Sequence, residues 1–282
     1  MKSFFSKISD ELSKISQYLE LLVHNVRQIK SVLRFKAFDT SNDEGRSKER
    51  YRRVVLTGAS SLVYKGITTL TGLISVPLTV NYLGEERYGL WMTITSTLAL
   101  LTFADLGLGN GLINAVSKAD GLNEKANATK AVSSAFFMLL AISLFLFAAF
   151  WIIYPYVRWQ RIFNVTSDLA ILESGPTVAV LMVAFLLNMV LGIIRRIHMG
   201  YQEGYINQLW LSGGAVFGLL GVLVAIYFKA GLPWLVLAIS GGPLVATLLN
   251  GFYLFGYARP WLFPRWKHFS LSATKDLAGV GL

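Results

Sequence analysis

Long apolar runs recur along this chain, and they restrict its fold more than any other feature of the sequence. A membrane-spanning helix needs about 20 predominantly apolar residues, and several runs here approach that length. Hydrophobic residues make up 54% of the chain and charged residues only 15%, whereas a soluble domain carries about 25% charged residues. The runs are continuous rather than alternating in segments of about ten residues, which excludes a membrane β-barrel. The sequence therefore predicts an all-α, polytopic membrane helical bundle.

The apolar runs predict six transmembrane helices. A polar segment precedes them, and an apolar stretch at 271–282 resembles the opening of a seventh span. The predicted organisation is an amphipathic or coiled-coil cytoplasmic helix at 1–38, a polar and then basic linker at 39–53, a six-helix lobe at 54–258, and an interfacial segment with the start of a seventh span at 259–282. The predicted spans are 54–80, 90–106, 132–154, 177–197, 209–228 and 232–255.

The distribution of basic residues predicts the orientation of these spans. One set of span ends carries few basic residues, namely Arg87, Arg158, Arg161 and Lys229. The other set is consistently richer: it holds the cluster 46–53 and Lys118, Lys125, Lys130, Arg195, Arg196, Arg259, Arg265 and Lys267. Lys and Arg concentrate in cytoplasmic loops, so the amino terminus and the end of the sixth span are expected inside. The net charge of +10 then reflects topology rather than nucleic-acid binding.

Residues 1–34 show a heptad pattern of apolar residues over about four repeats, as in a coiled coil. An amphipathic helix on the anionic inner leaflet fits the same segment, because Tyr18, Leu21 and Val23 widen its apolar face. A helix that packs on its own protein is the third interpretation.

Several chemistries are not expected from the residue content. The chain has no Cys and only three His, which excludes disulfides and thiolate zinc sites and disfavours a histidine metal cluster. There is no Ser/His/Asp set, no paired carboxylates and no metal-ligand spacing at suitable positions. We therefore expect a protein without a catalytic site, metal or cofactor.

Lys65 is the main candidate for binding substrate. It lies twelve residues after Arg53, or about 18 Å along a helix, which is near the middle of a hydrocarbon core about 30 Å thick. An ammonium group there costs at least about 2.5–3.5 kcal/mol, so it should face a wet cavity or a counter-charge. Tyr64 and Thr68 belong to the same stripe of small and polar residues and are expected to line that cavity. Alternatively, Lys65 extends to the interface or flanks a span that starts later.

Four further residues near span ends are candidates for the cavity or its mouth. Asp105 is either a gating, proton-sensitive carboxylate or a helix cap, and capping is the favoured interpretation. Asn114 is a further candidate for gating or lining the cavity. Arg195 and Arg196 act mainly as topology signals, but they could also bind a phosphate through forked hydrogen bonds.

Two motifs around the second span carry a family resemblance. The first is Leu-Gly-Glu-Glu-Arg-Tyr-Gly at 83–89, and the second is Asp-Leu-Gly-Leu-Gly-Asn-Gly at 105–111. Together they resemble the polysaccharide-export (O-antigen type) flippases of the MATE-like MOP superfamily, over roughly residues 54–282. Each motif alone is a weak signal.

The resemblance implies both a fold and a function. The implied fold is two six-helix lobes around a central cavity. The implied function is alternating-access transfer of an undecaprenyl-pyrophosphate-linked oligosaccharide across the bacterial cytoplasmic (inner) membrane, driven by an ion gradient or by membrane potential. Cations lining the cavity would face the pyrophosphate, and Lys65 matches that role by position only.

The length of this chain departs from the two-lobe pattern of the family, because its 282 residues are enough for only one six-helix lobe. A fragment of a longer two-lobe protein, or a pair of copies, would complete the cavity. The expected partners are lipid-linked oligosaccharide, membrane lipids, and a second lobe or polysaccharide-assembly proteins. Two other functions stay open: a membrane scaffold that recruits assembly partners through its amino-terminal helix, and a cation-coupled multidrug antiporter of the same superfamily. A membrane glycosyltransferase is the weakest alternative.

Overall fold

The computed structural model describes residues 38, 39, 42–100, 105 and 107–281. The predicted heptad helix at 1–34 lies outside the described residues. The chain forms two compact units, Met1–Ala59 and Ser60–Leu282, and each is described by itself. Helix α2 (Asp43–Leu83) runs through the boundary between them.

In the first unit, α2 begins at Asp43, whereas the sequence predicted a linker until residue 53. Opposite charges three and four residues apart stabilise the early turns. Lys48 donates to Glu44 at 2.6 Å, and Glu49 accepts hydrogen bonds from Arg52 and Arg53 at 2.7–3.0 Å. The absence of apolar residues, which suggested a linker, therefore does not prevent helix formation here.

The second unit is built from helices, and the residues that the structure describes contain no strand. Short helical turns follow α9, namely a π-helical turn at Leu254–Ala258 and 3₁₀ turns at Pro260–Leu262 and Trp266–His268. After the end of α2, the α-helices are α3 (Glu85–Ala99), α4 (Leu108–Gly121), α5 (Lys125–Ile153), α6 (Trp159–Ile162), α7 (Asp168–Gly200), α8 (Gly204–Tyr227), α9 (Leu232–Tyr253) and α10 (Leu271–Gly281). The all-α membrane architecture predicted from the sequence is confirmed.

Five helices of the described chain are long and apolar enough to cross a membrane. They begin near residues 44, 125, 168, 204 and 232 and coincide with five of the six predicted spans. The remaining predicted span, 90–106, coincides with α3, which has only 15 residues in the structure. Residues 101–104 and 106 follow it and lie outside the described part, so the count of six spans stays a prediction.

Helix α4 differs from the sequence-based expectation, which had no helix between 107 and 125. Gly107 takes a left-handed conformation (φ 73°) immediately before the helix, a backbone state that glycine adopts without steric cost. The buried residues Leu108, Leu112, Val116 and Ala119 then follow at helical spacing. Helix α4 packs on α5, α7 and α10. Its glycine-rich start concealed this amphipathic pattern.

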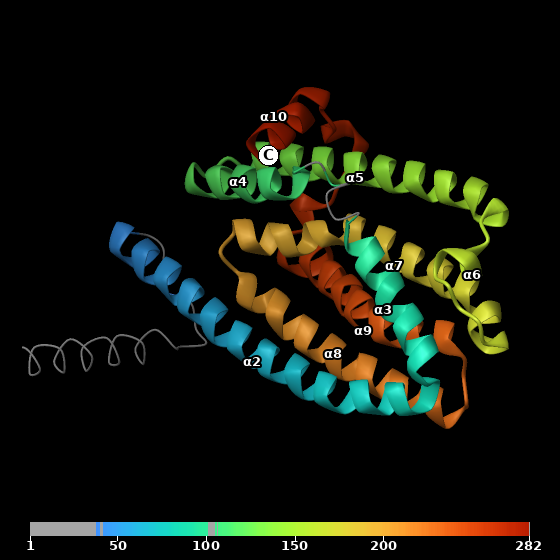
Figure 1. The fold of residues 1–282 in the computed structure, drawn as a ribbon. Coiled ribbons are helices and arrows are strands. Elements are labelled where there is room, and N and C mark those ends of the chain that lie inside the picture. Colours follow the sequence, from blue (N-terminus) through green and yellow to red (C-terminus); the bar gives the residue numbers. More distant parts are fainter. Residues whose placement is uncertain (1–37, 40–41, 101–104, 106, 282) are drawn as a thin grey trace, which may run out of the picture. The chain divides into compact units, whose positions relative to one another are not determined.

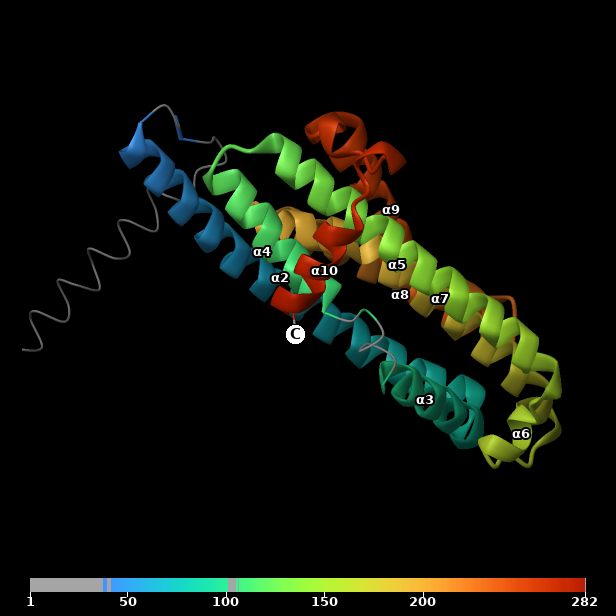
Figure 2. The ribbon, with the colours of Figure 1, turned by 90° about the horizontal axis from the view of Figure 1, so that it is seen from above.

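Helix α7 occupies the centre of the second unit, packing on α3, α4, α5 and α9 (Figures 1 and 2). It is the most buried of the five candidate spans. Two clusters of buried apolar side chains lie along it: one includes Ile193 and Ile197 near its carboxy-terminal end, and the other includes Ala170 and Val178 near its amino-terminal end. Helices α3, α4, α5, α6, α8 and α9 therefore contact α7 directly, and α10 is linked to it through α4 and α5.

Helices α8 and α9 lie side by side (Figure 1) and approach closely at glycines. A Cβ atom added at Gly214 would lie 2.8 Å from the Cβ of Ala246 and 2.9 Å from the carbonyl oxygen of Gly242. Small residues that allow backbones to approach are the usual means of packing helices in lipid. The neighbouring Gly213 has open space at the same position.

This difference predicts opposite outcomes for two adjacent substitutions. Gly214→Ala forces the α8 and α9 backbones apart, and overpacking of this kind destabilises by about 1–3 kcal/mol. Gly213→Ala meets no atom and gains helix propensity, so it is expected to be neutral or stabilising by up to about 1 kcal/mol. Thermal unfolding of the two variants in detergent measures the contrast, and equal stabilities would contradict the close α8–α9 contact.

Candidate functional site

The turn between α2 and α3 is joined to α7 and α9 by an ion pair. Arg87 donates from Nε and Nη2 to the two carboxylate oxygens of Glu173, at 2.6 and 2.8 Å. The same carboxylate accepts a hydrogen bond from the backbone nitrogen of Leu232 at 3.1 Å, at the start of α9. One glutamate therefore holds the amino-terminal ends of three helices together, which explains the charged part of the first motif.

Glu86, the neighbour of Arg87, contacts the start of α7 separately. Its carboxylate accepts hydrogen bonds from the hydroxyl of Thr166 at 3.1 Å and from the backbone nitrogen of Ser167 at 3.1 Å. Hydrogen bonds from Ser167 and Thr166 lower the pKa of Glu86 to about 2. Ser167 is the N-cap of α7, so this negative charge also lies where a helix dipole favours it.

The second motif meets the carboxy-terminal end of α7. Arg196 donates from Nη2 to the Oδ2 atom of Asp105 at 2.6 Å, while Oδ1 of Asp105 accepts from the backbone nitrogen of Gly107 at 3.1 Å. Asp105 thus accepts from the backbone nitrogen of Gly107, the residue before α4, and also pairs with Arg196, while its role as a helix cap stays a prediction. A gating role for Asp105 stays a prediction.

The glycines of this motif make room for close neighbours. A Cβ atom at Gly109 would collide with the Arg196 guanidinium, and one at Gly111 would collide with the backbone of Leu277 on α10. Arg196 lies so deeply that its Nη1 atom is buried without a hydrogen-bond partner among the described residues. The second motif therefore packs closely against two helices, with Asp105 and Gly109 against Arg196 of α7 and Gly111 against Leu277 of α10. It does not serve as a nucleotide-binding loop.

The two ion pairs lie at opposite ends of the same span. Glu173 and Arg196 are both on α7, and 23 residues of helix measure about 35 Å. The hydrocarbon core of a bilayer is about 30 Å thick. Both pairs therefore fall near the membrane boundaries, where charges are least costly.

A third ion pair lies beyond α7 and was not predicted. Arg259 donates from both Nη atoms to Glu203 at 2.7 and 2.9 Å, and its guanidinium lies over the Tyr201 ring at 4.0 Å. Burial opposes the charge of Arg259, but the hydrogen bonds and the charge of Glu203 outweigh it and raise the pKa of Arg259. Burial raises the pKa of Tyr201 to about 12. Arg259 had been counted only as a topology signal.

A buried hydrogen bond joins α7 to α9 near the same end. His198 Nε2 lies 3.0 Å from Asn250 Oδ1, and both side chains are fully buried. Their other polar atoms, His198 Nδ1 and Asn250 Nδ2, have no partner among the described residues. No sequence pattern indicated this pair, because each residue stands alone in an apolar run.

The predicted cavity residues of α2 are placed differently from the ion pairs. Lys65 is exposed, and within the described chain no hydrogen-bond or ion-pair partner contacts its ammonium group. Tyr64 is half-buried. The hydroxyl of Thr68 donates to backbone carbonyls of its own helix, at 2.9 Å to Tyr64 and 3.0 Å to Lys65.

The carboxy-terminal end of α2 gives a second reference point for the depth of Lys65, which stays a prediction. Helix α2 ends at Leu83, close to Tyr82, whose hydroxyl donates to the Ala230 carbonyl at 2.9 Å. Lys65 lies 18 residues before Leu83, or about 27 Å along the helix. In a core about 30 Å thick, that position is near the boundary opposite the α2–α3 turn rather than in the middle. The earlier estimate took Arg53 as the boundary, but the helix is longer than the core.

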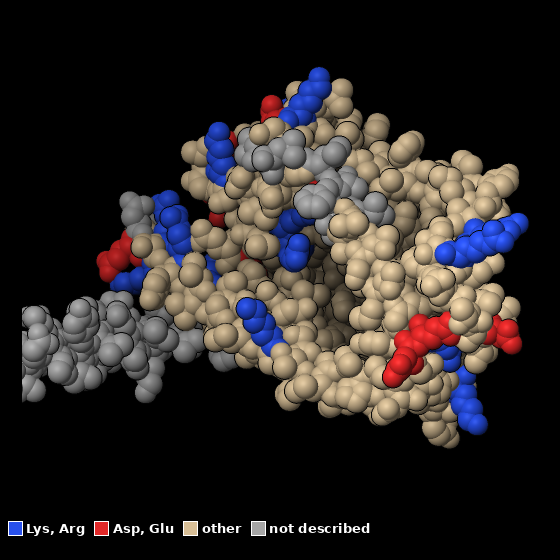
Figure 3. All heavy atoms as spheres, viewed as in Figure 1, with Lys and Arg blue, Asp and Glu red and all other residues tan. Residues whose placement is uncertain are grey.

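The remaining candidates are not brought together. Arg195 and Asn114 are exposed, on α7 and α4 respectively. Among the seven candidates, only Asp105 and Arg196 form a side-chain contact in the described residues. Figure 3 shows a hollow in an otherwise mostly uncharged face, with basic side chains at its edge.

Comparison with known proteins identifies relatives of this arrangement. The profile of a family described as "Polysaccharide biosynthesis protein" matches residues 55–282. A Salmonella typhi protein provisionally named an O-antigen transporter is 35% identical over 100 residues, which is 35% of this chain and 23% of that protein.

Solved structures show the same fold at low sequence identity. A MOP superfamily transporter from Pyrococcus furiosus matches with a TM-score of 0.68 and 16% identity, over 82% of this chain and 51% of that one. A multidrug resistance MATE family transporter of the MOP superfamily, in its outward-facing conformation, matches with a TM-score of 0.67 and 16% identity, over 81% and 50%. The chain therefore spans about half the length of these structures.

The Asp105–Arg196 contact predicts coupled effects of substitution. Asp105→Asn leaves a largely buried guanidinium without its counter-charge, and Arg196→Gln leaves the carboxylate unpaired. Each is expected to destabilise by about 1–3 kcal/mol. The double variant should lose less than the sum, with a coupling of about 1 kcal/mol.

Thermal unfolding of the four proteins in detergent measures this coupling. Asn114→Ala is the matched control, because Asn114 is exposed on the same helix α4, and it should leave stability unchanged. Strictly additive losses from Asp105 and Arg196 would show that the pair does not hold α4 to α7.

Proposed function

We propose, from the premise that the chain belongs to the polysaccharide biosynthesis protein family, that it is a membrane lobe of a flippase. The proposed substrate is an undecaprenyl-pyrophosphate-linked oligosaccharide. The lobe would act in the bacterial cytoplasmic membrane, with its amino terminus inside, in assembly of O-antigen or exopolysaccharide. It has no proposed enzymatic role.

The observation that carries this proposal is the unpaired cation on α2. Arg87, Arg196 and Arg259 each form an ion pair, whereas Lys65 is exposed on a candidate membrane span without a partner among the described residues. Near the boundary of the span such an ammonium costs less than at the bilayer centre, and without a carboxylate partner it is available to an anionic ligand. A phosphate ligand would supply the missing counter-charge through charge-assisted hydrogen bonds.

The revised depth of Lys65 suggests when it acts. A position near the boundary opposite the α2–α3 turn is the inner boundary under the proposed orientation. Lys65 would then meet the pyrophosphate as the lipid-linked substrate enters from the inner leaflet. Arg195, exposed on α7, is a second candidate for this contact. Arg196 would bind the pyrophosphate only if its ion pair with Asp105 were replaced by one with a phosphate group. Tyr64 and Thr68 would line the path beside Lys65.

Alternating access would need a second lobe, supplied by further chain or by a second copy, and a driving force from an ion gradient or membrane potential. A cation-coupled multidrug antiporter is the second candidate function, because the fold is shared with MATE transporters. The scaffold function rests on residues 1–34, outside the described part, and stays a prediction.

Export of surface polysaccharide tests the role of Lys65. With the chain expressed in its native gene context in a strain deleted for that gene, Lys65→Ala is expected to lower export about tenfold. This corresponds to the loss of one charge-assisted contact worth about 1.4 kcal/mol. Lys65→Arg should retain most export, because it keeps the positive charge.

The matched control is Lys229→Asn, which also removes an exposed lysine. Lys229 has a positive φ of 53°, a conformation that Asn tolerates, so this variant should export normally. Full export by Lys65→Ala would remove Lys65 from the mechanism. Cation-coupled dye efflux with unchanged polysaccharide on gene deletion would favour the antiporter instead.

A further inference from the structure

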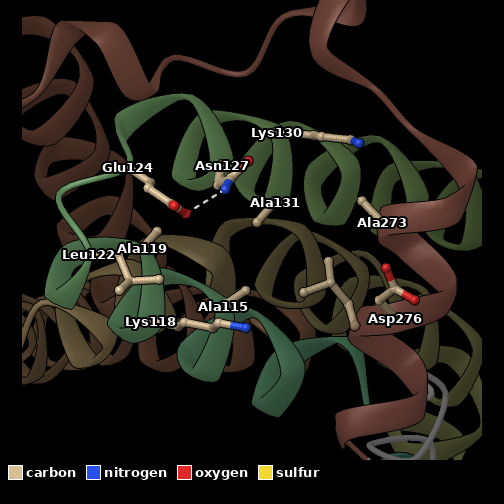
Figure 4. Close-up of a pocket in the computed structure, with 11 residues that line it drawn as sticks. Ala115, Lys118, Ala119, Leu122, Glu124, Asn127, Lys130, Ala131, Ala273 and Asp276 are labelled. Carbon is tan, nitrogen blue, oxygen red and sulfur yellow. Dashed lines mark hydrogen bonds between the residues drawn. The ribbon is translucent and has the colours of Figure 1, made fainter.

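A polar pocket of about 410 Å³ lies between α4, α5 and α10, away from Lys65 in the sequence. Figure 4 shows its polar side chains: Lys118 extends from α4, Lys130 from α5 and Asp276 from α10, while Glu124 lies at the other end beside Asn127. Alanines and leucines form the rest of the lining. The small alanine side chains leave the space between the charged groups open.

The charged groups of this pocket do not pair with one another. Asn127 donates to Glu124 at 2.6 Å, which holds that carboxylate at one end. Within the described chain, the side chains of Lys118, Lys130 and Asp276 have neither a hydrogen-bond nor an ion-pair partner. Two ammonium groups and a carboxylate that line one pocket without pairing with each other are available to a ligand.

The pocket also lies at a suitable depth for a lipid head group. The candidate span that starts at Lys125 has 32 residues, or about 48 Å of helix, while the hydrocarbon core is about 30 Å and the whole bilayer about 40–45 Å thick. The first turns of α5, which carry Lys125 and Lys130, therefore extend into the head-group layer. The Lys125 amino group lies 5.7 Å from the Trp261 ring centre, and tryptophan is enriched at this layer.

We propose that this pocket binds a zwitterionic phosphate group, namely a phosphate ester that carries a primary amine. Lys118 and Lys130 donate to the phosphate oxygens, and Asp276 accepts from the amine. Either an aminoalkyl phospholipid of the membrane or a soluble phosphorylated amine presents this chemistry. The site is separate from the proposed transport contact at Lys65.

Native mass spectrometry of the full chain in detergent tests the proposal with short-chain phosphatidylethanolamine, phosphatidylglycerol and phosphatidylcholine. The unmodified protein is expected to retain phosphatidylethanolamine most strongly. The double variant Lys118→Ala and Lys130→Ala should weaken the binding of all three lipids about tenfold. Each exposed charge contact contributes about fivefold or less to the affinity. Asp276→Asn should remove only the preference for phosphatidylethanolamine over phosphatidylglycerol.

Lys275→Ala is the matched control, because Lys275 is exposed on α10 beside the pocket but does not line it. The double variant Lys118→Arg and Lys130→Arg should still bind lipid. It serves as the control that a protein substituted at both positions folds. Competition by O-phosphoethanolamine assigns the site to soluble ligands, and its failure to compete assigns it to lipid. Equal losses in Lys275→Ala and in the double alanine variant, or an unchanged lipid preference in Asp276→Asn, would overturn the proposal. None of these outcomes depends on transport, so the proposal for this pocket can fail while the flippase proposal stands.

Discussion

Helix α7 is held at both ends by charge, and the second unit depends on this constraint. At one end Glu173 binds Arg87 and the start of α9, and at the other Arg196 binds Asp105 at the start of α4. In lipid, apolar side chains gain little from contacting each other rather than acyl chains. Directional contacts at the span ends, together with close glycine packing, therefore set the arrangement of these helices. Each ion pair adjoins one of the two apolar clusters.

The sequence predicted the spans well because lipid imposes a simple requirement. A backbone in hydrocarbon must satisfy its own hydrogen bonds, so apolar runs such as 132–154 and 232–255 become helices whatever their other contacts. Hydrophobicity did not predict the helices formed by segments with fewer apolar residues. Residues 43–53 form a helix through local charge pairs, and α4 was concealed by its glycines.

The candidate site was harder to predict because its contacts are distant in sequence. Asp105 and Arg196 were each singled out, but nothing in the sequence linked two residues 91 positions apart. Glu173 and Glu203 gave no signal, since a single acidic residue at a helix end is ordinary. The structure separates basic residues that have a carboxylate partner, such as Arg87 and Arg196, from basic residues such as Lys65 whose side chains have none in the described chain. That difference, rather than charge itself, distinguishes groups that hold the fold from groups available to a ligand.

The long sequence separation within these ion pairs also has a consequence for biosynthesis. Arg87 precedes Glu173 by 86 residues, which a ribosome adds in roughly 4–17 seconds at about 5–20 residues per second. During that interval Arg87 and Asp105, which lie on either side of most of α3, have not yet met Glu173 and Arg196. The two motifs near the ends of α3 therefore form their ion pairs only after α7 has been synthesised, so these contacts do not form in the order of synthesis.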